Sequence, residues 1–224
     1  MAGTITALKA QSRDKERVNV YLDGKFAFGL ALIHALWLKV GQNLSDADIE
    51  TLQAADTLEK AQQRALNLIS YRPRSEKEVR LRLKRAGVDE PGILTVIQKL
   101  KDAGLLNDEA FSQQWVESRV RANPRGKRMI RWELKQKGVG DTEIASALEG
   151  VDDHQTAYVA ASRRWSRLAT LEPRERKRKL MDFLARNGFD YDVISSVVNQ
   201  LIEEHSAADS DSDETTGTDE AFED

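Results

Sequence analysis

The feature that most constrains this chain is a unit that occurs three times, at a spacing of 50 to 51 residues, around Gly87, Gly138 and Gly188. Apolar residues stand at matching offsets four residues before and one, six and ten residues after each glycine: Leu83, Leu134 and Leu184; Val88, Val139 and Phe189; Ile93, Ile144 and Ile194; Ile97, Leu148 and Val198. A Pro-Arg pair precedes each glycine, at Pro73-Arg74, Pro124-Arg125 and Pro173-Arg174. Repeats of this length are typical of supersecondary units stacked in a line, which bind surfaces more often than they catalyse.

Helical signals run from about residue 57 to residue 205. In repeat 1, a first helix is predicted to end before Pro73, a second to begin at the capping box of Ser75 and Glu78, and Gly87 to end that second helix. A third helix follows, and the other two repeats keep this order. The predicted fold class is therefore mainly α, an elongated array of tandem three-helix repeats at residues 56–106, 107–151 and 152–205.

Residues 1–55 follow a different pattern, which predicts a small β-containing domain. Arg17 to Tyr21 alternate polar and apolar, Asp23-Gly24 comes next, and a second short apolar run follows it. Asp-Gly between such runs predicts a hairpin, because its tight turn needs positive φ. A third strand is expected at Thr4 to Ala10, and short helices at Leu30 to Leu38 and after Ser45, with Trp37 packed in this domain.

The charge is unevenly distributed along the chain. The formal net charge is -3, yet residues 206–224 hold eight Asp or Glu and no Lys or Arg. Residues 60–188 hold 28 basic and 17 acidic residues, so the repeats form a cationic body. The tail at 206–224 is too polar to bury a core and is predicted to be disordered, serving to solubilise the chain or to compete with DNA for the basic body.

Several function classes find no support in the residues. There is no cysteine, no histidine cluster of the kind a metal site needs, and no Gly-rich phosphate loop. A nucleophile, a base and an orienting group cannot be assembled, so we expect no enzyme, no metal and no cofactor. No apolar run is long enough to span a bilayer, and there is no secretory signal, so a cytoplasmic protein is expected.

Basic residues recur on the second helix of each repeat. They are Lys77, Arg80 and Lys84 in repeat 1; Lys127, Arg128, Arg131 and Lys135 in repeat 2; and Arg174 with Arg176, Lys177, Arg178 and Lys179 in repeat 3. Residues three and four positions apart share a helix face. A solvated face explains any one of these helices, but three equivalent helices favour a stripe that binds a phosphate backbone or an acidic protein groove.

The tryptophans are open to two interpretations, core packing or stacking on nucleic-acid bases. Trp115 and Trp165 lie 50 residues apart at nearly equivalent repeat positions, which favours core packing. Trp132 directly follows Arg131, and its role stays open.

Three motifs resemble the RecX family of recombinase regulators over roughly residues 57–200. They are ALNLISYRPRSE at 65–76; GLLNDEAF at 104–111, continued by Trp115-Val116 and Arg119; and PRGK at 124–127, with Glu133-Leu134 and Lys137-Gly138-Val139. The resemblance implies three three-helix modules in a curved rod. It also implies binding in the helical groove of the RecA–single-stranded DNA filament, with inhibition of ATP hydrolysis and strand exchange and a role in recombination, DNA repair and the SOS response.

We therefore predict a monomeric, non-enzymatic regulator whose partners are the RecA filament and single-stranded, or also double-stranded, DNA. Two alternatives are a stand-alone, sequence-independent nucleic-acid-binding repeat protein and a helical scaffold whose charges only solubilise it. The predicted contact residues are basic: Arg72, Arg74, Lys77, Arg80, Lys84, Arg125, Lys127, Arg128, Arg131, Lys135, Arg174, Lys177 and Arg178.

Overall fold

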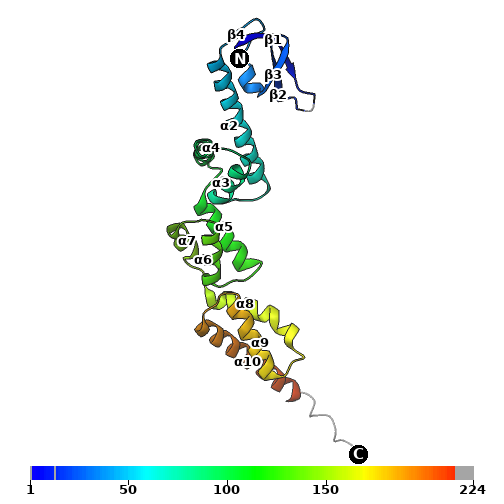
Figure 1. Ribbon diagram of the computed structural model, residues 1–224. Helices are drawn as coiled ribbons and strands as arrows, with labels where there is room; N and C mark the ends of the chain where they lie inside the picture. The colour runs from blue at the N-terminus through cyan, green and yellow to red at the C-terminus, as the bar shows by residue number, and fades with distance from the viewer. Residues whose placement is uncertain (1, 13, 215–224) are drawn as a thin grey trace, which may run out of the picture. The chain divides into compact units, whose positions relative to one another are not determined.

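The computed structural model describes the backbone of residues 2–12 and 14–214 and the side chains as far as residue 206 (Figure 1). The chain divides into two compact units, Met1–Asn107 and Asp108–Asp224, here called unit 1 and unit 2. Unit 1 holds the sheet and repeat 1, and unit 2 holds repeats 2 and 3. The predicted fold class, mainly α with tandem three-helix repeats and an N-terminal hairpin domain, is confirmed.

The sheet of unit 1 is antiparallel, with the strand order β3-β2-β1-β4. Its strands are β1 (Gly3–Ala10), β2 (Arg17–Leu22), β3 (Lys25–Ala31) and β4 (Asn43–Leu44). Asp23 and Gly24 join β2 to β3 with φ values of 48° and 79°. Two consecutive positive φ angles are what a tight hairpin turn requires, so the predicted hairpin and third strand are confirmed.

Two expectations for the N-terminal region are wrong. The helix expected at residues 30–38 is only α1 (Leu32–Ala35), because the β2–β3 ladder continues as far as Ala31. The short helix after Ser45 and the separate helix from residue 57 are one helix, α2 (Asp46–Tyr71). No Gly or Pro occurs within α2 to interrupt it. It therefore carries the chain without a break from the sheet into repeat 1.

Asp56 joins α2 to the hairpin. Its carboxylate accepts hydrogen bonds from the Arg17 guanidinium at 3.0 Å and the Ala31 amide at 2.8 Å, and it pairs with Lys60 at 2.7 Å. Burial alone would raise the pKa of Asp56, but the donors from Arg17, Lys60 and Ala31 outweigh it, so the pKa lies below its ordinary value.

Repeat 1 is completed by α3 (Glu76–Arg85) and α4 (Glu90–Asp102), which pack against α2. The predicted capping box at Ser75 and Glu78 is present. Gly87 follows α3 with φ of 81°, and Val88 N–H donates to the Leu83 carbonyl at 3.2 Å. This is the left-handed helix ending that favours glycine, so the glycine that marks the repeat has a backbone role.

Unit 2 contains α5 (Asp108–Arg121), α6 (Lys127–Gln136) and α7 (Asp141–Leu148), followed by α8 (Asp153–Trp165), a 3-10 turn η1 (Ser166–Leu168), α9 (Pro173–Arg186) and α10 (Tyr191–Glu214). Leu134 of α6 and Leu184 of α9 are fully buried, as Leu83 of α3 is in unit 1. The repeated leucine therefore supplies the centre of each three-helix core.

The structure extends α10 beyond the boundary predicted at residue 205. The helix runs as far as Glu214. It continues past residue 205 because no Gly or Pro occurs between Ser195 and Glu214 to interrupt it. The rest of the predicted disordered tail, residues 215–224, lies outside the described residues.

Candidate binding surface of the three-helix repeats

Several basic residues of repeat 1 pair with acids at the start of α3, whereas Arg82, Lys84 and Arg85 of α3 are exposed. Arg72 pairs with Glu78 at 2.9 Å, and Arg80 pairs with Glu76 at 3.3 Å and also with Glu90. Lys101 binds Glu76 at 2.6 Å, and this contact is the main reason that the pKa of Glu76 lies below its ordinary value. Much of the positive charge predicted for repeat 1 is thus neutralised within repeat 1.

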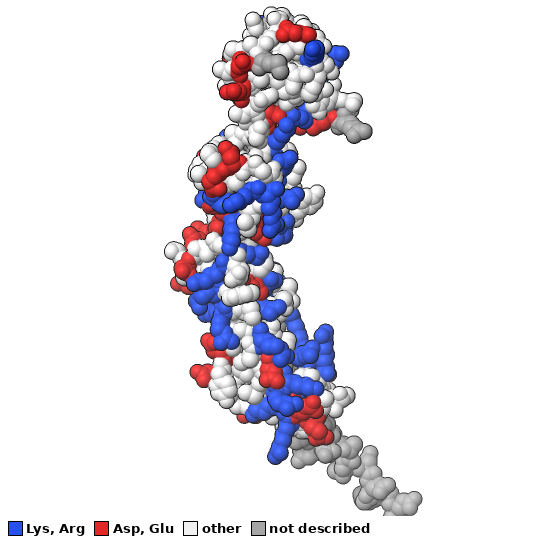
Figure 2. Space-filling model, in the orientation of Figure 1, with Lys and Arg blue, Asp and Glu red and all other residues white. Residues whose placement is uncertain are grey.

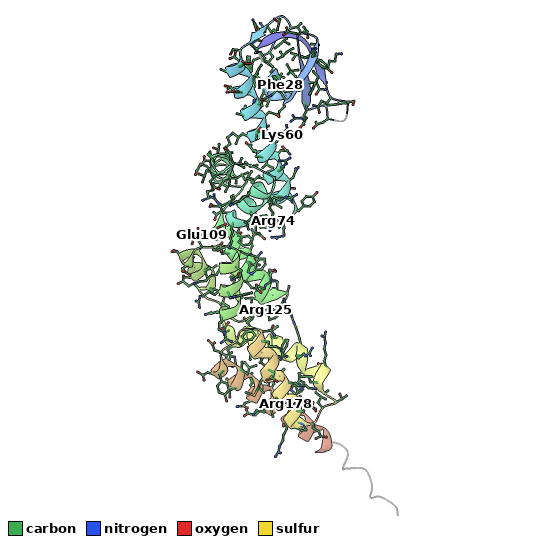
Figure 3. The ribbon with its side chains drawn as sticks, viewed as in Figure 1. Phe28, Lys60, Arg74, Glu109, Arg125 and Arg178 are labelled. Carbon is green, nitrogen blue, oxygen red and sulfur yellow. The ribbon has the colours of Figure 1, made fainter. Side chains whose placement is uncertain are left out.

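The arginines of the first two Pro-Arg pairs point inward rather than outward (Figure 3). Arg74 is half-buried, and its Nε donates to the Leu68 carbonyl at 3.4 Å. Arg125 is also half-buried, with its Nε buried and without a hydrogen-bond partner among the described residues. Arg74 thereby ties the chain that leads into α3 back to α2.

The third Pro-Arg pair is not structurally equivalent to the other two. Pro73 and Pro124 stand two residues before the N-caps Ser75 and Gly126, whereas Pro173 is the first residue of α9. Helix α9 therefore begins about one turn earlier, and Arg174 is exposed on that added turn. Proline suits this first position because its missing N–H is not needed there.

Helix α6 differs from α3 in having no acid of its own beside its basic residues. Arg128, Arg131, Trp132 and Lys135 are exposed at helical spacing on one side, while Ile130 and Leu134 are fully buried on the other. Arg131 has no ion pair among the described residues, Arg128 has a long one to Asp190 at 3.9 Å, and Lys135 pairs with Asp141 of α7 at 3.0 Å. We call Arg128, Arg131, Trp132 and Lys135 the α6 face.

The acidic residue of α6 is directed away from this face. Glu133 accepts hydrogen bonds from Trp115 Nε1 at 2.7 Å and from Arg119 Nε at 2.6 Å, both of α5. The Arg119 guanidinium also lies 4.3 Å from the centre of the Trp115 ring. Glu133 is thus used inside repeat 2 and does not neutralise the α6 face.

Residues of repeat 3 hold the start of α6. The N-cap, Gly126, has no side chain, and the Lys127 amide instead donates to the carboxylate of Asp153 in α8 at 3.0 Å. Gly126 N–H donates to the Asn187 carbonyl at 3.0 Å. Burial raises the pKa of Asp153 and the Lys127 amide opposes that rise. Repeats 2 and 3 therefore position the α6 face together.

Helix α9 adds further cations to unit 2. Lys177 donates to Asn199 at 3.1 Å, and Arg178 is exposed (Figure 3). Arg176 turns inward instead: it donates to the Leu171 carbonyl at 3.2 Å and lies 5.0 Å from the centre of the Trp165 ring. Figure 2 shows Lys and Arg side chains gathered on the visible face of the helical part of unit 2.

The tryptophans differ in environment. Trp165 is buried in the core of repeat 3, and Trp115 packs on that of repeat 2, so core packing is confirmed for both. Trp132 is 59% exposed. Trp37, expected to pack in the N-terminal domain, is 83% exposed, and that expectation is wrong. The apolar run around Trp37 is longer than the short helix α1, so its side chains cannot all face the sheet.

Ten of the thirteen predicted contact residues fall into three groups; of the others, Lys77 and Lys84 are exposed on α3, and Lys127 is half-buried at the start of α6. Arg74 and Arg125 are turned inward, and Arg72 and Arg80 are paired with acids. Exposed basic residues of unit 2 make up the third group: Arg128, Arg131, Lys135, Arg174, Lys177 and Arg178. The sequence analysis placed Arg176 in the outward basic cluster and gave Arg119 no contact role, yet both turn inward. For Arg119, the signal was its position four residues after Trp115 on one helix.

Among the described residues, no group of His, Asp and Glu could hold a metal ion. Within the same residues, no helix is both long and apolar enough to cross a membrane.

Comparison with known proteins gives a consistent result along the chain. Models of four RecX domains match: the N-terminal domain of regulatory protein RecX at residues 3–45, and the first, second and third three-helix domains at 61–100, 107–148 and 152–198. Regulatory protein RecX of Bacillus subtilis (strain 168) is 34% identical over 202 residues, covering 88% of this chain and 76% of that protein. The protein of the same name from Clostridioides difficile (strain 630) is 31% identical over 205 residues, with 89% and 96% covered.

Solved structures agree with these matches. A crystal structure of regulatory protein RecX superposes with a TM-score of 0.69 at 29% identity, covering 88% of this chain and 99% of that one. The crystal structure of RecX from Lactobacillus salivarius gives a TM-score of 0.58 at 28% identity, with 66% and 97% covered. The sheet, the three helical repeats and these matches together show that the chain belongs to the RecX family of regulatory proteins.

Proposed function

We propose that this protein regulates a RecA-type recombinase without catalysing a reaction itself. It binds the RecA–single-stranded DNA filament as a monomer in the cytoplasm and lowers both ATP hydrolysis and strand exchange. The family membership supports the recombinase as partner. The observation that carries the proposal is the α6 face, whose exposed Arg128, Arg131 and Lys135 lack a neutralising acid on their own helix.

The physical basis of binding is electrostatic. Phosphates of the filament DNA, or acidic side chains of the recombinase, replace the counterions of the α6 face and of the exposed cations of α9. Because the second helix of every repeat is basic, several weak contacts can form together, and linked contacts raise the overall affinity. A binder that spans neighbouring recombinase molecules favours one filament geometry, which changes ATP hydrolysis without contacting the nucleotide.

The direct test is ATP hydrolysis by the cognate RecA on single-stranded DNA, with this protein titrated in. We expect hydrolysis to fall at well under one molecule of this protein per recombinase. The variant Arg128→Glu, Arg131→Glu, Lys135→Glu should lose the inhibition while its circular dichroism stays unchanged, because all three side chains are exposed. Full inhibition by the folded variant would exclude the α6 face from the mechanism.

The cationic surface of unit 2 also supports a second function, sequence-independent binding of nucleic acid without a recombinase. Its mark is a steep salt dependence of binding to bare DNA, since every neutralised phosphate releases a counterion. Tight binding to bare DNA with no effect on RecA hydrolysis would favour this second function over the first.

A further inference from the structure

Trp132 is the one residue of the α6 face that is not basic, and it is 59% exposed. Trp115 and Trp165 show how the other tryptophans of unit 2 are used: Trp115 donates to Glu133 and Trp165 is buried. Within the described residues, Trp132 has neither a hydrogen bond nor a ring contact. A large aromatic ring exposed to solvent among three cations indicates a binding site.

A shallow hollow of about 340 Å³ lies beside this ring. It is lined by Arg128, Met129 and Trp132 of α6 and by Ala185 and Gly188 at the end of α9. The lining is thus mainly apolar, with a guanidinium at its edge. Both helices belong to unit 2, so the hollow is a feature of one compact body.

The hollow is held in place by tight packing of glycine backbone. A Cβ at Gly188 would lie 2.7 Å from the backbone nitrogen of Met129, and a Cβ at Gly126 would lie 2.7 Å from the backbone nitrogen of Phe189. Real side chains do not tolerate such distances. The two helices therefore meet backbone to backbone, and the wall beside Trp132 is set before any ligand arrives.

We propose that Trp132 and this hollow bind one unstacked base of single-stranded DNA, while Arg128, Arg131 and Lys135 bind the adjoining phosphates. The arrangement matches a nucleotide part by part: a flat aromatic surface for the base and positive charge on the same helix face for its backbone. A base within a duplex is stacked on both sides and cannot reach the ring. Single-stranded DNA is therefore the form that this site selects.

The alternative occupant is an apolar side chain of a protein partner. The charge pattern favours DNA, because DNA phosphates would pair with the three cations around the ring, whereas an apolar side chain would not. The inference deepens the proposed function by assigning a direct DNA contact, and its test omits the recombinase so that the two ideas fail separately.

The experiment compares two oligonucleotides of equal length, one of thymidylate and one of abasic nucleotides with the same phosphates. Binding of each is measured by fluorescence anisotropy for the unaltered protein, Trp132→Ala, Trp132→Phe and the control Trp37→Ala. Trp37 is a matched control because it is also highly exposed but belongs to unit 1. Both alanine changes remove an exposed ring, so the fold should be unaffected.

We expect Trp132→Ala to weaken thymidylate binding by about 5- to 100-fold, the range for loss of one stacked base. Trp132→Phe should recover most of that loss, because the phenyl ring keeps a stacking surface. Neither change should alter binding of the abasic strand, and Trp37→Ala should alter neither. The quenching of intrinsic fluorescence by thymidylate should disappear in Trp132→Phe and persist in Trp37→Ala.

Two results would overturn the inference. One is unchanged thymidylate binding by Trp132→Ala, including the case in which that variant loses inhibition of RecA; the ring would then contact protein, and the proposed function would stand. The other is an equal loss on thymidylate and abasic strands, which would show that the ring only supports the neighbouring cations.

Discussion

Helices α3 and α6 are counterparts in repeats 1 and 2, each ten residues long and each basic, yet they present different surfaces. Helix α3 carries Glu76 and Glu78 in its first turn, and these acids bind Arg80 and Arg72. Helix α6 has no acid in its first turn, and its single acid, Glu133, faces Arg119 inside the repeat. Acids of α3 itself thus pair with two arginines of repeat 1 and leave Arg82, Lys84 and Arg85 exposed. On the α6 face, the close pair among the described residues is that of Lys135 with Asp141 of α7.

The difference follows from how each helix begins. Ser75 and Glu78 cap α3 from within its own sequence, and the carboxylate that caps it also neutralises an arginine. Helix α6 begins at Gly126 and receives its capping carboxylate from Asp153 in α8. An acid supplied from another helix satisfies the first amide without placing negative charge on the exposed face. Helix α6 is therefore more open to a ligand and more dependent on its neighbour than α3.

The sharpest way to break this dependence is Gly126→Ala. The added methyl group would meet the backbone of Gly188 and Phe189, which cannot move aside as a flexible side chain would. We expect a loss of about 3 kcal/mol in the free energy of unfolding of unit 2, followed by urea titration of tryptophan fluorescence. Gly140→Ala is the control, because Gly140 is also an N-cap and its methyl group would meet only the Glu143 side chain. Equal stability of the two variants would contradict the proposed clamp.

Charge reversal tests the comparison at the surface. Reversing Arg128, Arg131 and Lys135 on α6 removes three exposed cations, so the affinity for single-stranded DNA should fall about 100-fold. The slope of log affinity against log salt concentration should become shallower by about two to three neutralised phosphates. Reversing Arg72, Arg80 and Lys84 in repeat 1 should cost less binding, because Arg72 and Arg80 both hold acids closely, whereas on α6 only Lys135 does. Binding isotherms at several salt concentrations measure both variants. Equal losses would mean that local neutralisation does not decide which repeat binds.

The two caps should respond differently to substitution. Ser75→Ala removes half of a capping box and should cost about 1 kcal/mol. Asp153→Ala should cost a similar amount, but Asp153→Asn should be nearly neutral at pH 7, since the amide oxygen still accepts from Lys127 and no charge is buried. Urea unfolding at fixed pH gives all three values. A cost for Asp153→Asn as large as that for Asp153→Ala would show that the charge itself is needed.

The pKa of Asp153 predicts the accompanying pH dependence. Burial raises that pKa in the folded protein, so the folded state binds the proton more tightly than the unfolded state. The contribution of this carboxyl to stability should therefore fall as the pH rises from about 4 through the raised pKa and stay constant above it. The stability difference between the unaltered protein and Asp153→Asn, measured by urea unfolding from pH 4 to 7, should shift in favour of the unaltered protein at the acidic end. The opposite slope would contradict the assigned shift.

The sequence predicted the repeated core because periodicity reports burial directly: Leu83, Leu134 and Leu184 recur with the glycines and are fully buried. The spacing of Lys and Arg by three and four residues likewise predicted a basic face on the second helix of each repeat. It could not tell which cations stay open, because their partners are set by folding: Arg80 meets Glu90 of the next helix, and Glu133 meets Arg119 of the previous one. Trp132 illustrates the same limit, since local sequence does not distinguish a ring facing the core from one facing solvent.

The smallest expected effect concerns residues 215–224, which lie outside the described part of the chain. Four of them are acids, Asp219, Glu220, Glu223 and Asp224, and Phe222 lies among them. An acidic segment that competes with DNA should act on the exposed cations of the α6 face. Ending the chain at Glu214 should then tighten binding to single-stranded DNA about two- to threefold at low salt and leave it unchanged at high salt, where such attraction is screened. In the α6 charge-reversal background the same truncation should have no effect, because the surface for which the tail competes is gone. A gain that persists in that background would place the competition elsewhere, and equal affinity at low salt would exclude competition.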